Sequence, residues 1–183
     1  MHFPKYIILF CILITTLPAL SQKNNRRDTV SASWIRQNIT DNPVSSTWLH
    51  DHLSEKPRLV FTSYIEKQLR KELKKFSWLS AYYRLIQAEA SRVLSKPALK
   101  WKKEGRRLLG VSREALRRIS TLAIVYRLEG DNKHLERLNR EMYAVSSFSD
   151  WNPSHFLDVA EMSLGVALGL DWAGEALPDS TVA

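Results

Sequence analysis

The segment from Ser154 to Ala176 carries apolar side chains on nearly every face of the helix that it is expected to form. Its apolar residues are Phe156, Leu157, Val159, Ala160, Met162, Leu164, Val166, Ala167, Leu168, Leu170 and Trp172. A helix that is apolar all round has no side suited to solvent, so it is normally buried among other elements. The segment therefore predicts a helix at the centre of a larger assembly.

Apolar spacings of three and four residues predict further helices before this segment. We expect one helix to begin with a capping box at Ser63, and a second to run from Trp78 to about Leu94, where Pro97 ends it. A third helix is expected from Ser112, its N-cap, to Glu129. These amphipathic segments would form the outer helices around the apolar one.

The dipeptide Gly130-Asp131 predicts a tight connection between two antiparallel helices. Glycine is the residue that most readily adopts the left-handed conformation past a helix end, and aspartate is a preferred N-cap. No segment has the alternation of a β-strand. The prediction is an all-α fold of antiparallel hairpins, arranged as a helical toroid or an α-solenoid.

The first 21 residues have the form of a secretory signal peptide. Lys5 precedes an apolar run, YIILFCILITTL, of about twelve residues, which is too short to cross a bilayer core of about 30 Å as a helix. Small residues then precede an expected cleavage after Ser21. An uncleaved anchor is the alternative. Residues 22–56 are expected to be a polar leader, and residues 57–183 the helical domain.

Export changes the meaning of the net charge of +8. An excess of cations is typical of proteins that bind nucleic acids, membrane surfaces or acidic polysaccharides. A periplasmic or secreted protein rarely meets nucleic acid, and we expect no membrane contact after cleavage of the signal peptide. An acidic polysaccharide is therefore the expected partner. One cysteine excludes a disulfide within the chain.

The segment DWNPSHFLDVAEM, residues 150–162, places polar and aromatic side chains where the apolar helix begins. A tryptophan can stack on a sugar ring, and the amide and imidazole can bind its hydroxyl or carboxylate groups. Trp151, Asn152 and His155 are therefore candidate substrate-binding residues. The alternative is that Trp151 packs and Asn152 or Ser154 caps the helix.

A second candidate for polyanion contact is the basic stretch that holds Arg106, Arg107 and Trp101. The basic residues of 67–75 instead suggest a solvated helix face. The spacing of His155, Asp158 and Glu161 does not match a zinc helix, so the two carboxylates are expected to hold neighbouring helices or basic side chains. Nucleophile-elbow and phosphate-loop motifs are absent, and we expect no metal ion or cofactor.

Several segments together resemble the N-terminal region of heparinase II/III-type polysaccharide lyases. They are residues 56–62, 78–83, 104–109, 111–120, 126–131 and, most specifically, 150–162. The resemblance covers about residues 57–178. It implies an incomplete (α/α) toroid that is followed by antiparallel β-sheet domains, and an exported enzyme that cleaves uronic-acid polysaccharides such as heparin, heparan sulfate or alginate by β-elimination.

Members of that family are several hundred residues long, so the resemblance implies that this chain is an N-terminal portion. Its catalytic residues are then expected beyond Ala183, together with the rest of the toroid and the β-sheet domains. Expressed alone, the chain is expected to bind weakly and cleave nothing. The alternative hypothesis is a non-catalytic exported helical repeat module that binds glycan or protein.

Overall fold

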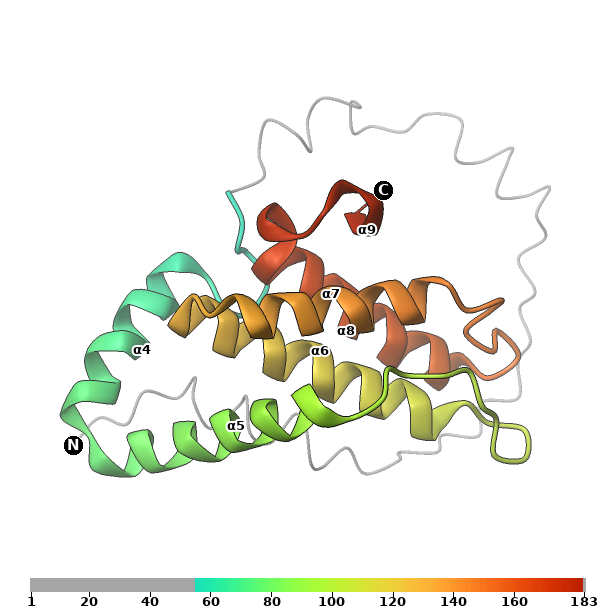
Figure 1. Ribbon diagram of the computed structural model, residues 1–183, viewed down its shortest axis with the longest axis horizontal. Helices are drawn as coiled ribbons and strands as arrows, with labels where there is room; N and C mark the ends of the chain where they lie inside the picture. Colours follow the sequence, from blue (N-terminus) through green and yellow to red (C-terminus); the bar gives the residue numbers. More distant parts are fainter. Residues whose placement is uncertain (1–54, 183) are drawn as a thin grey trace, which may run out of the picture. The chain divides into compact units, whose positions relative to one another are not determined.

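The computed structural model describes residues 55–182. These residues are all-α and contain no β-strand (Figure 1). The helices are α4 (Ser63–Lys75), α5 (Ser77–Ser95), α6 (Leu109–Glu129), α7 (Asn132–Ser146), α8 (Phe156–Ala173), the 3-10 turn η1 (Gly174–Ala176) and α9 (Asp179–Val182). The expected signal peptide and nearly all of the expected leader lie outside the described residues.

The helix ends agree with the sequence in some places and differ in others. Helix α5 ends at Ser95, before Pro97, as expected. Helix α4 is capped by Thr62, whose side chain accepts a hydrogen bond from Ile65 N, so the capping box at Ser63 is wrong by one residue. Ser112 is not an N-cap, because it is buried inside α6.

The connection between α6 and α7 confirms the hairpin that the sequence predicts. Gly130 is left-handed, with φ = 73°, and its N–H donates to Tyr126 O at the end of α6. The Asp131 side chain accepts from Lys133 N and caps α7. Two adjacent residues therefore end one helix and start the next.

Helices α6 and α8 form the closest pair in the domain, and α7 packs against both of them. Figure 1 shows that α6 and α8 run in the same direction, whereas α7, which comes between them in the sequence, runs in the opposite direction. Glycine permits the close approach: a Cβ atom on Gly165 would lie only 3.0 Å from Leu116 Cα. Gly165 thus lets the backbone of α8 lie directly against the backbone of α6.

The core lies between these three helices. Its members in α6, α7 and α8 include Ile119, Leu122, Val125, Leu138, Met142, Val145, Met162, Leu168 and Trp172. Only one side of α8 is covered by the described residues, because Phe156, Leu157 and Leu164 are exposed. The sequence predicts that this helix is buried on all sides. Among the described residues, only one of its faces is buried.

The start of the described chain is fixed to the end of α8. Asp171 accepts hydrogen bonds of 2.8 Å from the backbone N–H groups of Arg58 and Leu59. The Trp172 indole donates to Leu59 O, and its ring lies 5.7 Å from that of Phe61. These contacts bring the two ends of the helical domain together.

Candidate functional site

Two loops meet at the end of the domain where α8 begins. One is the connector between α5 and α6, residues 96–108, and the other joins α7 to α8, residues 147–155. The Asn152 amide donates to Arg106 O at 3.0 Å, and the Trp101 indole donates to Asp150 O at 3.1 Å. The structure thus brings together the two regions that the sequence singled out separately.

The Asp158 carboxylate, which is fully buried, holds this junction together. It accepts hydrogen bonds from Leu108 N at 2.8 Å and from the Asn152 amide at 2.6 Å, and it lies 3.0 Å from His155 Nδ1. Burial alone would raise the pKa of Asp158, but the hydrogen bonds and the nearby imidazole outweigh it, so the pKa lies below its ordinary value. Asp158 therefore stays a carboxylate that orders both loops.

Asn152 is buried beneath the surface of the junction, so its side chain holds the loops together and is not exposed to a ligand. Its side chain is buried, and its backbone is left-handed, with φ = 57°. Asparagine is among the few residues other than glycine that adopt this conformation readily. The residue is therefore suited to the turn, and its amide is engaged by Arg106 O and Asp158.

His155 is half-buried at the surface of the junction. Its Nδ1 faces the Asp158 carboxylate, so the ring is held with Nδ1–H as the donor. Among the described residues, Nε2 has no hydrogen-bond partner. The imidazole therefore offers this second nitrogen to a ligand.

Of the two tryptophans at the junction, Trp101 is the exposed one. The Trp151 indole donates to Val145 O at 2.9 Å and the residue is half-buried, whereas Trp101 is exposed. Lys103 Nζ lies 5.2 Å from the centre of the Trp101 ring. Trp101 was visible in the sequence only as an aromatic residue within a basic stretch, and its contact with Asp150 O explains its position.

Some of the basic residues near the junction form ion pairs with glutamates. Arg113 pairs with Glu161, and Arg117 and Arg118 both pair with Glu114. The Ser112 hydroxyl also donates to Glu161, so the expectation that Asp158 and Glu161 hold neighbouring elements is confirmed.

Other cations at the junction form no ion pair with described residues, and all of them except the half-buried Lys103 are exposed. Together with the aromatic ring and the imidazole they make up the loop cluster: Lys100, Trp101, Lys102, Lys103, Arg106, Arg107 and His155. Exposed cations beside an aromatic ring suit an anionic ligand with an apolar face. The loop cluster is therefore the candidate binding site.

A scan against models of protein families and a search of curated proteins gave no match to this sequence. Within residues 55–182 no group of His, Cys, Asp and Glu side chains has the arrangement to hold a metal ion. None of the described helices combines the length and the apolar character that a membrane span requires.

Proposed function

We propose that this chain is the N-terminal portion of an exported polysaccharide lyase that acts on uronic-acid glycans by β-elimination. The observation that supports this best is the loop cluster, where Arg106, Arg107 and Trp101 lie together on a junction fixed by Asp158. Arginine matches carboxylate and sulfate groups geometrically, and the indole face suits the apolar face of a sugar ring. An acidic polysaccharide has both features.

The proposed architecture is part of an (α/α) toroid. Support comes from the packing of α6 against α8, with α7 between them in sequence and covering both. In an (α/α) toroid, each helix likewise packs against the helix two positions further along the chain, and the helix between them in sequence covers both. The exposed side of α8, with Phe156, Leu157 and Leu164, is where a further inner helix would pack in such a ring.

The role proposed for the loop cluster is to bind the glycan rather than to break it. Cations there would neutralise substrate carboxylate or sulfate groups, and the His155 imidazole would contact a hydroxyl or anionic group. β-Elimination also needs a base for the C5 proton and an acid for the leaving oxygen. We place those groups beyond Ala183, so the chain alone is expected to be inactive.

A second candidate function is a non-catalytic exported module that binds glycan or protein. The same loop cluster favours it, since the junction offers cations and one imidazole rather than a set of proton-transfer groups. Cleavage by the chain continued beyond Ala183 would distinguish the lyase from this module.

The test is binding of the purified chain to heparin, heparan sulfate and alginate at low salt, with a neutral glycan for comparison. We expect weak binding to the acidic glycans alone, and a loss of about two- to fivefold in Arg106→Gln. Arg140→Gln removes the same charge from an exposed position on α7 and should not change binding. Equal losses in the two variants, or binding to the neutral glycan, would refute the loop cluster as the site. Unsaturated uronate absorbance would refute the inactivity of the chain alone.

A further inference from the structure

Some cationic side chains of this domain form ion pairs with carboxylates and others do not, and the two groups lie in different parts of the domain. Those between α5, α6 and α7 are paired: Glu141 pairs with both Arg118 and Arg137, and Glu89 with Arg92 and Arg117. At the other end of α5 from the loop cluster, exposed cations of α4 and α5 have no ion pair with described residues. They are Lys67, Lys71, Lys74, Lys75 and Arg84.

A hollow of about 480 Å³ lies beside these unpaired cations, between α4, α5 and the end of α6. Lys74 of α4 and Arg84 of α5 are among its lining residues, and Leu73 and Leu128 give it apolar walls. This volume falls in the range of small-molecule sites, and the combination of apolar walls with a few polar groups is usual for them. The hollow is a groove open to solvent rather than an enclosed cavity, so a ligand in it would remain partly exposed.

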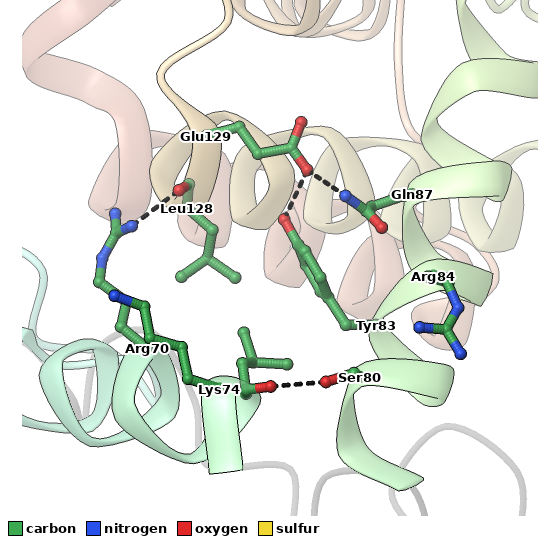
Figure 2. A pocket seen from close by; sticks show the side chains of 9 residues that line it. Arg70, Lys74, Ser80, Tyr83, Arg84, Gln87, Leu128 and Glu129 are labelled. Carbon is green, nitrogen blue, oxygen red and sulfur yellow. Dashed lines mark hydrogen bonds between the residues drawn. The ribbon is translucent and has the colours of Figure 1, made fainter. Parts of the chain in front are cut away.

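The one carboxylate in the hollow is already engaged. Figure 2 shows the Tyr83 hydroxyl and the Gln87 amide pointing at Glu129, at 2.8 and 2.7 Å. Burial, and then the hydrogen bond and charge of Glu129, raise the pKa of Tyr83 well above its ordinary value, so the hydroxyl remains a neutral donor. These neutral donors orient Glu129 but leave its negative charge in place, so the two lining cations without an ion pair, Lys74 and Arg84, exceed it by one charge.

Arg70 fixes the hollow and is not itself free for a ligand. Its guanidinium donates to Leu128 O and Arg127 O at the end of α6, and also binds Glu66 within α4. These bonds hold α4 against α6 at a helix end whose carbonyl groups need donors. The lining cations without an ion pair to described residues are then Lys74 and Arg84. Figure 2 shows the Arg84 guanidinium directed away from Glu129, so it lies at the rim of the hollow rather than inside it.

We propose that this hollow is a second binding site for an acidic saccharide unit, and that one polysaccharide chain engages it together with the loop cluster. Lys74 and Arg84 would contact carboxylate or sulfate groups, while Leu73 and Leu128 pack against the sugar. The inference rests on the proposed function, because it takes an acidic glycan as the ligand of the loop cluster.

The two sites are well separated along the domain. Figure 1 shows the corner of α4 and α5 at one end of α5, and the connector with the loop cluster at the other. From Arg84 to the last residue of α5, Ser95, the helix extends roughly 16 Å. A disaccharide cannot reach both sites, but a polysaccharide can, and binding at the first site raises its effective concentration at the second.

The experiment compares the affinity of the purified chain for long heparin chains and for the heparin disaccharide, at fixed low salt. The double variant Lys74→Gln/Arg84→Gln removes the second site. Its matched control, Lys133→Gln/Arg140→Gln, removes the same charge from exposed positions on α7. Circular dichroism checks that each variant keeps its helix content.

We expect the long chains to bind at least about tenfold more tightly than the disaccharide when both concentrations are expressed in disaccharide units. The hollow variant should lose most of this advantage, whereas the control variant keeps it. An unchanged advantage in the hollow variant, or an equal loss in both variants, overturns the second site. A third variant, Arg106→Gln/Arg107→Gln, separates the two proposals: its failure to weaken binding would refute the loop cluster, whatever the hollow variant does.

Discussion

The side-chain amide of Asn152 donates a hydrogen bond of 2.6 Å to Asp158, and neither side chain is open to solvent. The same amide bonds Arg106 O, and the same carboxylate bonds Leu108 N. One buried pair thus joins the connector after α5 to the first turn of α8. The exposed cations of the loop cluster depend on this pair for their position.

Replacing Asp158 with alanine should destabilise the domain and disorder the loop cluster. The change leaves Leu108 N–H and one of the two N–H groups of the Asn152 amide buried without an acceptor. An unsatisfied buried polar group costs about 1–3 kcal/mol, so we expect the free energy of unfolding to fall by about 3 kcal/mol. Urea denaturation measures this change. Glu104→Ala, an exposed carboxylate on the same connector, serves as the control and should have little effect.

Replacing Glu141 with glutamine should be more damaging than its small change in shape suggests. Glu141 is fully buried on α7 and pairs with Arg118 and Arg137, whose side chains are 8% and 3% exposed. Removal of one partner from a buried ion pair leaves an uncompensated charge and costs about 3–5 kcal/mol. Thermal denaturation should show the loss. Glu136→Gln, on the exposed side of the same helix, should melt near the wild-type temperature, and equal melting of the two variants would contradict this account.

The close contact between α6 and α8 predicts different outcomes for two glycines. A Cβ atom on Gly165 would meet the backbone of Leu116 at 3.0 Å, whereas one on Gly110 would find only a flexible side-chain atom, Glu104 Oε2, at 3.9 Å. Gly165→Ala should therefore lower the free energy of unfolding by about 1–3 kcal/mol, since a packed helix pair must separate. Gly110→Ala should leave it unchanged or raise it by up to about 1 kcal/mol. Chemical denaturation of both variants decides the matter.

The helices could be predicted from the sequence because their causes are local. Apolar residues three and four apart outline the buried face of α6, and Gly130 and Asp131 determine the turn by their own conformational preferences. The cap at Ser112 could not be excluded in this way. Its hydroxyl is bonded to Glu161, 49 residues away, and only the packing of α6 on α8 shows why a serine lies inside a helix.

The sequence predicts where the candidate site lies, but it does not predict what each of its residues does. The sequence marks residues 150–162 as a candidate because polar groups stand where an apolar helix begins, and the structure places Asn152 of this segment beside Arg106. The sequence could not show that Asn152 would be buried by a connector 46 residues earlier in the chain. Nor could it show that Trp101, rather than Trp151, would remain exposed.

A buried histidine provides the basis for a prediction on pH. His134 lies in the first turn of α7, and neither ring nitrogen has a hydrogen-bond partner among the described residues. Burial lowers the pKa of His134 below 6.5, and the charge of Lys133 lowers it further, although Glu129 and Asp131 oppose this. The folded state therefore favours the neutral ring.

Acidification should destabilise the domain through His134. Well above pH 6.5 the ring is neutral in both states, so it adds no dependence on pH there. Below pH 6.5 the unfolded chain binds a proton that the folded chain takes up only at lower pH, so the free energy of unfolding falls, by at most about 1.4 kcal/mol per pH unit. Denaturation at pH 7.5 to 5 should show this slope. His134→Leu should remove most of this slope, and an unchanged slope in this variant would assign the effect to other groups.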